Sequence, residues 1–182
     1  MQFPETIETE RLILRPWRED DAAACYEYAK DPRVGPMCGW LPHKSEEESR
    51  EIIRTILSAA MNYAVTRKGA DEAIGSIGFY PTTRQETMGH VALGYWLGEP
   101  HWGNGYIPEA AEALLKTAFR LGAREIWAAH YAENHNSRRV LHKLGFTYRF
   151  RDTELVEALG EEKELWYYAI SRDHFSLLTP HS

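Results

Sequence analysis

The chain has 182 residues, with 27 acidic and 21 basic side chains and a formal charge of −6. Hydrophobic residues make up 43% and charged residues 26%, which are ordinary values for a globular protein and exclude a disordered or fibrous chain. The length fits one domain, which we expect to span residues 1–182, and the acidic balance argues against a nucleic-acid partner while it is compatible with a cationic one.

Cys25 and Cys38 are the two cysteines, and they form no Cys-x-x-Cys pair and have no matching histidine spacing. We therefore expect no metal site, and two lone thiols are typical of a reducing compartment. The first residues lack the basic and apolar segments of a signal peptide, and no apolar run approaches the length of about 18 residues that a membrane span needs. We expect a soluble, cytoplasmic protein with no membrane partner.

Hydrophobic periodicity predicts strands and helices that alternate along the chain. The expected strands are 9–17, 63–67, 73–80, 90–97, 125–131, 146–152 and 165–171. The expected helices run from the acids at 19–21 to Tyr28, from the capping box at 45–48 to Ala60, from Ile107 to Leu121 and from Ser137 to Leu144. Residues 34–43 and 157–164 are expected as connections. This order indicates a mixed α/β (α+β) fold, with helices on a mostly antiparallel sheet of six or seven strands.

The strongest chemical signal is a glycine-containing turn, Trp102-Gly103-Asn104-Gly105-Tyr106, between a strand and a helix. The two glycines permit positive φ angles, and the helix that follows brings free N–H groups and a positive dipole end, which suit a phosphate. An ordinary tight turn explains the same residues equally well. A Walker A motif is absent, Pro108 stands where the dinucleotide fingerprint needs a third glycine, and no Gly-x-Ser-x-Gly or His-Glu-x-x-His motif occurs.

Four segments follow one another in a characteristic order: Glu8–Arg15, Gly94–Leu97, Trp102–Tyr106 with Glu109-Ala110, and Asn134–Phe146, which contains Ser137 and closes with Leu144-Gly145-Phe146. Through these segments, residues 7–173 resemble the GNAT superfamily of acyl-CoA N-acyltransferases, in its RimJ/RimL-like branch of ribosomal-protein N-terminal acetyltransferases. The resemblance implies the GNAT fold, in which a splayed pair of strands admits acetyl-CoA as a cosubstrate.

The resemblance also implies which residues hold acetyl-CoA. Backbone N–H groups of residues 102–107 would bind the pyrophosphate, and main-chain groups at the end of strand 90–97 would pair with pantetheine, which Asn134 also faces. The implied cofactor-binding residues are Trp96, Leu97, Trp102, Gly103, Asn104, Gly105, Tyr106, Ile107, Asn134 and Ser137.

The chain departs from the family pattern at three of these aligned positions. Trp102 stands where Gln or Arg is usual, and Ile107 replaces a small residue. Leu141 stands where many members have a Tyr that protonates the leaving thiolate. Ser137 is the candidate replacement, either as the acid or as a hydrogen-bond donor to the thiolate, and an N-cap role for Ser137 is an equal alternative.

The expected reaction is direct attack of a neutral amine on the thioester. Leu97 supplies the N–H that stabilises the oxyanion, so Leu97 and Ser137 are the expected catalytic residues. An α-amine with a pKa of about 7.7–8.0 is roughly 10–15% neutral at pH 7, whereas a Lys amine is about 0.04% neutral. The acceptor is accordingly expected to be a protein or peptide N-terminus or a small amine.

Neither the general base nor the acceptor is fixed by the sequence. The candidate bases near this segment are Glu86, His90, Glu99 and His101, and none is assigned. An apolar acceptor wall is expected from Met37, Trp40 and Leu41, with Tyr167 or Tyr168 opposite. A monomer and a homodimer both fit the sequence. Two other functions are carried as alternatives: a non-catalytic GNAT-fold module that only binds CoA, and an unrelated nucleotide binder that uses the turn around Gly103 and Gly105.

Overall fold

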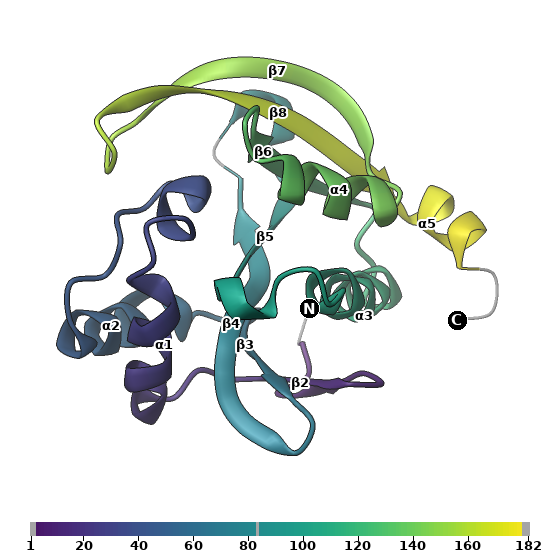
Figure 1. Cartoon of the computed structure of the whole chain (residues 1–182). Helices are drawn as coiled ribbons and strands as arrows, with labels where there is room; N and C mark the ends of the chain where they lie inside the picture. The colour runs from purple at the N-terminus through teal and green to yellow at the C-terminus, as the bar shows by residue number, and fades with distance from the viewer. Residues whose placement is uncertain (1–2, 83, 180–182) are drawn as a thin grey trace.

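The computed structural model describes residues 3–82 and 84–179, and within them one sheet of eight strands organises the molecule (Figure 1). The strands lie in the order β1-β2-β3-β4-β5-β6-β8-β7, and every neighbouring pair is antiparallel except β5 and β6. Their bounds are β1 (Ile7–Glu8), β2 (Leu12–Arg15), β3 (Asn62–Arg67), β4 (Ala70–Pro81), β5 (Val91–Leu97), β6 (Glu125–Tyr131), β7 (Thr147–Val156) and β8 (Glu161–Ser171).

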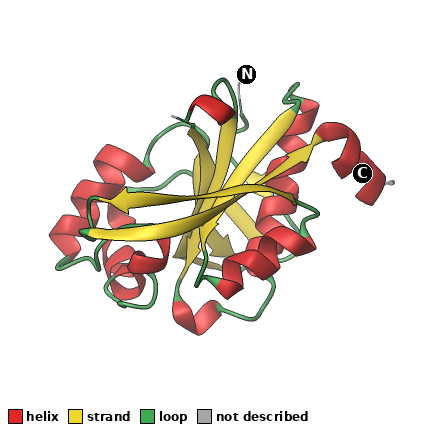
Figure 2. Ribbon diagram, turned by 90° about the horizontal axis from the view of Figure 1, so that it is seen from above, coloured by secondary structure: helices red, strands yellow, loops and turns green. Residues whose placement is uncertain are grey.

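Helices cover both sides of this sheet, as the view from above shows (Figure 2). The α-helices are α1 (Ala22–Ala29), α2 (Glu46–Ile52), α3 (Tyr106–Arg120), α4 (His135–Lys143) and α5 (Arg172–Leu178). Short helical segments are η1 (Glu19–Asp21), η2 (Gly35–Cys38), η3 (Ile53–Leu57), η4 (Gln85–Thr87) and η5 (Glu99–His101). None of the helices in the described residues combines the length and the apolar character that crossing a bilayer requires.

The hydrophobic core is divided between the two sides. Apolar residues of α3 recur every three to four positions, so that one face of the helix is buried in the larger cluster together with Leu12, Ile77 and Ile126 of the sheet. On the other side, α1 and η3 pack on the sheet around Trp17 and Trp96. The central strands are therefore buried on both faces, which explains their near-continuous apolar sequences.

A gap between β5 and β6 positions the site. These parallel strands pair only at Val91 with Ile126 and at Ala92 with Trp127, and then they diverge. Beyond these pairs, residues 93–97 and 128–131 have no ladder partner across the gap. Parallel strands end at the same edge of a sheet, and each of these two strands leads into a helix. The starts of α3 and α4 therefore lie beside the open end of the gap (Figure 1).

The predicted mixed α/β fold with a mostly antiparallel sheet is confirmed, and the seven expected strands and four expected helices are all present. The structure differs from the prediction at the two edges of the sheet and at the C-terminal helix. The strand expected at 9–17 is two, β1 and β2, and the sheet therefore has eight strands among the described residues. The second half of the connection expected at 157–164 is strand, because β7 and β8 form a long ribbon with exposed ends where charged residues are tolerated. The terminal helix α5 was not predicted.

Candidate functional site

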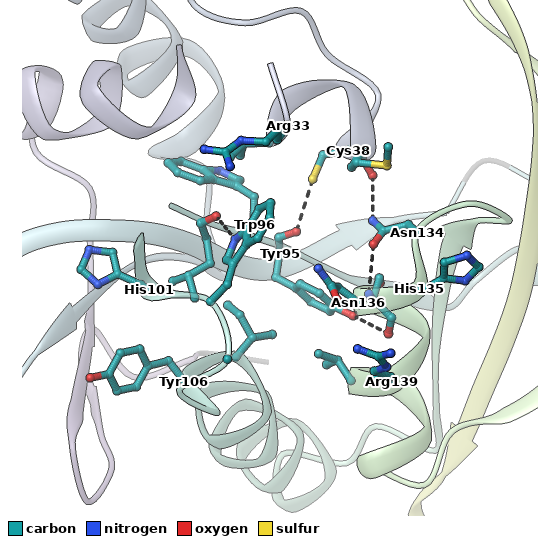
Figure 3. Close-up of a pocket in the computed structure, with 18 of the residues that line it drawn as sticks. Arg33, Cys38, Tyr95, Trp96, His101, Tyr106, Asn134, His135, Asn136 and Arg139 are labelled. Atoms are coloured by element: carbon teal, nitrogen blue, oxygen red, sulfur yellow. Dashed lines mark hydrogen bonds between the residues drawn. The ribbon is translucent and has the colours of Figure 1, made fainter. Parts of the chain in front are cut away.

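A pocket of about 740 Å³ opens where β5 and β6 diverge. Its walls come from four segments: the loop around η2, the end of β5, the turn into α3, and α4 with the residues before it (Figure 3). Of the ten expected cofactor-binding residues, nine line this pocket: Trp96, Leu97, Trp102, Gly103, Gly105, Tyr106, Ile107, Asn134 and Ser137. The tenth, Asn104, does not, because its side-chain amide turns back to the carbonyls of His101 and Trp102 at 3.0 and 3.1 Å.

The turn before α3 leaves N–H groups available to a ligand. Gly103 and Gly105 have φ angles of 76° and 77°, which an L side chain rarely adopts. Gly105 is the N-cap of α3 and, among the described residues, no side chain caps this end. The N–H of Glu109 bonds to the Gly105 carbonyl at 3.2 Å, so the N–H groups of Tyr106 and Ile107 precede the first helical bond. Free donors and the positive end of the helix dipole thus face one wall of the pocket.

Contacts from Glu109 and Arg11 hold this turn in place. Glu109, in the first turn of α3, accepts hydrogen bonds from the Thr9 hydroxyl, the Arg11 backbone N–H and the Arg11 guanidinium, the last at 2.6 Å. Arg11 also donates to the Asn104 carbonyl at 3.0 Å and lies over the Tyr106 ring. Burial would raise the pKa of Glu109, but the hydrogen bonds from Thr9 and Arg11 outweigh it and hold that pKa below its ordinary value. Glu109 therefore stays ionised and orders the turn.

Backbone groups at the end of β5 point into the gap. The Gly98 N–H bonds to the Ile74 carbonyl of β4 at 2.9 Å, and bonding in an antiparallel ladder alternates, so the N–H and C=O of Leu97 face away from β4. The Trp102 indole donates to the Leu97 carbonyl at 2.7 Å. Trp102, which departs from the family pattern, thus ties the turn to β5. This bond occupies the Leu97 carbonyl, one of the two Leu97 groups expected to pair with pantetheine. The Leu97 N–H stays available to a ligand.

Ser137 lies on the pocket side of α4, and its N-cap interpretation is wrong. The N-cap of α4 is Asn134, whose side-chain oxygen accepts the Ser137 N–H at 3.0 Å. The Ser137 hydroxyl instead lies 2.8 Å from the Tyr95 hydroxyl. The Asn134 amide nitrogen donates to the Met37 carbonyl at 3.2 Å, so both ends of this amide have protein partners. Asn134 therefore fastens the start of α4 to the η2 loop.

Tyr95 is the site residue that the sequence analysis missed. The alternation of β5 places Tyr95 and Trp96 on opposite faces: Trp96 packs with Trp17 and Trp40, whereas Tyr95 reaches α4. Burial raises the pKa of Tyr95, an effect that the Ser137 hydrogen bond only partly offsets, so the phenol stays protonated at neutral pH. Leu141, at the family's Tyr position, is fully buried in the core and does not line the pocket.

Of the four possible bases, His101 alone lines the pocket. Its Nε2 lies 3.1 Å from the Tyr28 hydroxyl, and burial, together with Arg67, lowers its pKa. Glu99 is ion-paired with Arg33 at 3.0 Å, and Glu86 lies near Arg84. His90 lies outside the pocket, with its ring 6.4 Å from that of Trp127 and tilted by 54°.

Most of the residues expected to form the acceptor wall do not line this pocket. Met37 lines the pocket, but Trp40 packs on Trp96 and Tyr168 is 2% exposed in the core against His130. Tyr167 lies under Arg84. The expectation was wrong for Tyr168, because its ring completes the core beside the site. For Trp40 and for the exposed Leu41 it stays a prediction.

The Cys38 thiol lies next to the Tyr95 carbonyl in the pocket wall. Cys38 is an exposed residue of the pocket wall, but its sulfur lies 3.7 Å from that carbonyl oxygen, and burial of the thiol raises its pKa to about 12. A thiol with so high a pKa is largely protonated at neutral pH and is a weak nucleophile. Among the described residues, no three His, Cys, Asp or Glu side chains gather as a metal site would require.

The sequence pattern of the acetyltransferase (GNAT) domain matches residues 11–147. A relative, the uncharacterized N-acetyltransferase p20 of Bacillus licheniformis, is 28% identical over 178 residues, which cover 94% of this chain and 99% of that protein. The crystal structure of an acetyltransferase (GNAT family) from Bacillus anthracis has a TM-score of 0.81 at 27% identity and covers 92% of this chain and 99% of that one. RimJ of Mycobacterium smegmatis, solved with CoA-disulfide, shares the fold with a TM-score of 0.78 at 21% identity, covering 99% of this chain and 98% of its own.

The domain match runs from the residue before β2 to the first residue of β7 and includes all four segments that form the pocket. The resemblance inferred from the sequence is thereby confirmed, and the GNAT fold implies acetyl-CoA binding. The chain belongs to the GNAT acetyltransferase family and is an acyltransferase.

Proposed function

We propose that this protein transfers the acetyl group of acetyl-CoA to a primary amine, namely a peptide N-terminus or a small amine. The observation that carries the proposal is the gap between β5 and β6, which brings the uncapped start of α3, the Leu97 N–H and the Ser137 hydroxyl into one pocket. When bound there, acetyl-CoA supplies an activated thioester. The free N–H groups of Tyr106 and Ile107 fit its pyrophosphate.

The proposed catalytic groups act on the two charges that the reaction creates. The Leu97 N–H, which faces the gap, donates to the thioester oxygen as a C–N bond forms and that oxygen becomes negative. Ser137 donates its hydroxyl proton in a hydrogen bond to the sulfur as the C–S bond breaks. The two hydroxyls lie 2.8 Å apart. In this mechanism Tyr95 donates to the Ser137 oxygen, which orients that hydroxyl and makes it a better donor. The amine loses its excess proton to water.

The charges in the pocket favour an acceptor that needs little help from a base. Among the described residues that line it, Glu133 is the one carboxylate, and it is paired with Lys163 at 2.8 Å. No free carboxylate is thus available to deprotonate a Lys amine, whose neutral fraction at pH 7 is about 0.04%. An α-amine is already roughly 10–15% neutral at that pH, so positioning suffices. We therefore propose an α-amine as the preferred acceptor.

Thiol release with a panel of amines tests this proposal. Acetyl-CoA is supplied with a peptide that has a free N-terminus and no Lys, an N-blocked peptide that contains Lys, a polyamine and an aminoglycoside. Faster release with the first peptide than with the blocked one supports an α-amine acceptor. Acetyl-CoA binding without release for any amine supports the alternative of a non-catalytic module. A thermal shift with ATP or NAD but not acetyl-CoA would favour the unrelated nucleotide binder.

Ser137→Ala tests the assigned role of the hydroxyl. We expect kcat to fall about tenfold or more, because a hydrogen bond to a developing charge is worth roughly 1.5–3 kcal/mol, while the Kd for acetyl-CoA stays within about twofold. The control is Ser176→Ala on α5, whose hydroxyl bonds to the Arg172 carbonyl and does not line the pocket. A wild-type kcat in Ser137→Ala would remove Ser137 from the mechanism.

A further inference from the structure

Two of the cations that line the pocket have no ion partner among the described residues. In a chain with a formal charge of −6, the described residues lining the pocket include three Arg or Lys side chains and a single, already paired carboxylate. Arg33 is neutralised by Asp31 at 2.6 Å and Glu99 at 3.0 Å. Arg139 and Lys143 have neither an ion pair nor a hydrogen bond to any other described residue. The pocket thus holds two uncompensated positive charges.

Both free cations lie on one side of α4. Arg139 and Lys143 are four residues apart, so they lie one helical turn from each other on the same face. Both are exposed and both line the pocket, and Figure 3 shows Arg139 across the pocket from Tyr106 at the start of α3. Arg138, next along the helix, does not line the pocket and stacks instead on the Trp166 ring. The face of α4 that bears Arg139 and Lys143 therefore lies toward the pocket, whereas Arg138 lies on another face of the helix.

The pocket accordingly has two different anion sites. The start of α3 offers neutral N–H donors, which suit a pyrophosphate in close contact with the backbone. The α4 pair offers full positive charges on long side chains, which suit a more strongly charged, more exposed group. Coenzyme A carries such a group besides its pyrophosphate: the 3′-phosphate of its ribose, a phosphomonoester with a charge near −2 at pH 7. Its adenosine follows the pyrophosphate directly, so the group lies within reach of the neighbouring helix.

We infer that Arg139 and Lys143 bind the 3′-phosphate of coenzyme A and make this protein select it over cofactors that lack this phosphate. The inference rests on the proposed function, because it assumes that the pocket takes acetyl-CoA. It adds a second recognition site, on α4, to the one at the start of α3.

The test compares the binding of CoA with that of 3′-dephospho-CoA by calorimetry at low ionic strength. We expect the wild type to bind CoA at least about tenfold more tightly, which corresponds to about 1.4 kcal/mol. In the double variant Arg139→Gln/Lys143→Gln, we expect the Kd for CoA to rise until it equals the Kd for dephospho-CoA. The Kd for dephospho-CoA should differ from its wild-type value by less than about twofold. The difference between the two ligands should also shrink in the wild type as salt is added.

Arg138→Gln is the matched control, since it removes the same charge from the same helix but outside the pocket. It should keep the preference for CoA. Because Lys143 in the last turn also complements the helix dipole, each variant is first checked for an unchanged far-UV spectrum and melting transition. Lys143→Arg keeps the positive charge in the last turn of α4, so this variant should retain the preference for CoA over dephospho-CoA.

Three outcomes separate the inference from the proposed function. Equal affinity of the wild type for CoA and dephospho-CoA overturns the inference and leaves acetyl transfer intact. An equal loss for both ligands in the double variant also overturns it, because the two side chains would then act on another part of the cofactor. Failure of both ligands to bind the wild type overturns the proposed function itself.

Discussion

At the scale of single residues, the site depends on pairs that are distant in sequence. Ser137 gains its role from Tyr95, which lies 42 positions earlier, and the pair is buried enough to keep Tyr95 protonated. A hydroxyl is a weak acid on its own, and a second hydroxyl that donates to it strengthens it as a donor. In the proposed mechanism the two residues act as a unit in which Tyr95 is the positioning residue.

Tyr95→Phe tests this unit without altering the shape of the pocket. We expect kcat to fall about fivefold, in line with the loss of a hydrogen bond worth about 1 kcal/mol, with little change in the KM for acetyl-CoA. The loss should disappear in the Ser137→Ala background. An equal loss from Tyr95→Phe in both backgrounds would show that the phenol acts independently of Ser137.

A second pair, Arg15 with Asp21, contributes to stability rather than to the reaction. Arg15 is 4% exposed and donates to both Asp21 oxygens at 2.7 and 2.8 Å, and it also contacts the exposed Asp71. Asp21→Asn leaves Arg15 buried with that weaker partner, so the free energy of unfolding should fall by about 3 kcal/mol in urea titrations. The neighbouring, exposed Asp20→Asn serves as the control and should change it by less than about 0.5 kcal/mol.

At the scale of elements, the turn into α3 and its helix form one structural unit, which we propose as the pyrophosphate site. The sequence was sufficient to predict this unit, because glycines, a proline in the first turn and an apolar periodicity are local signals. The contacts that orient it were not predictable in the same way. Arg11 and Glu109 are 98 positions apart, and their ion pair follows from the packing of the β1–β2 turn on α3.

Gly105→Glu tests the unit. Bulk and negative charge at the start of α3 should raise the Kd for CoA at least about 100-fold, because they repel the pyrophosphate and compete for the same N–H groups. Gly122→Glu, at the other end of the helix, is the control: its φ of 99° imposes a similar backbone cost, and no atom lies within 4 Å of an added Cβ. If both variants bind CoA equally well, the turn is not part of the site.

The roles of residues on α4 show where sequence reasoning stopped. The helix and its polar start were predicted, but not which polar group caps it and which faces the pocket. Asn134 and Ser137 are both good N-cap residues, so composition alone could not separate them. The structure separates them because α4 begins at His135, two residues before the predicted start, which moves Ser137 into the first turn.

At the scale of the whole molecule, several titratable groups make the fold sensitive to acid. Burial lowers the pKa values of His43, His101 and His130, in each case as the largest cause. Hydrogen bonds to arginines lower those of Asp31, Asp71 and Asp152. In each case the folded state binds fewer protons than the unfolded state within the affected range, so stability is lost as the pH falls.

We therefore expect stability to decline in two stages on acidification. The histidines act as the pH falls below their unfolded value of 6.5, and the carboxylates act below about 4. His43 lies outside the pocket, and His43→Gln removes the contribution of one buried histidine to this pH dependence. Between pH 7 and 5, the unfolding free energy of the variant should therefore fall less steeply than that of the wild type. An unfolding free energy that is constant across this range in the wild type would contradict the assignment.

The gap between β5 and β6 has a mechanical consequence for the sheet. Strands β1–β5 and strands β6–β8 share two register pairs of backbone across this seam, and the remaining amides of residues 93–97 and 128–131 have no partner strand there. An extended ligand lying in the seam would act as a missing strand and join the two halves of the sheet. Hydrogen–deuterium exchange of the Leu97 amide should slow on ligand binding, and the occupied protein should resist being pulled apart along this line more than the empty one.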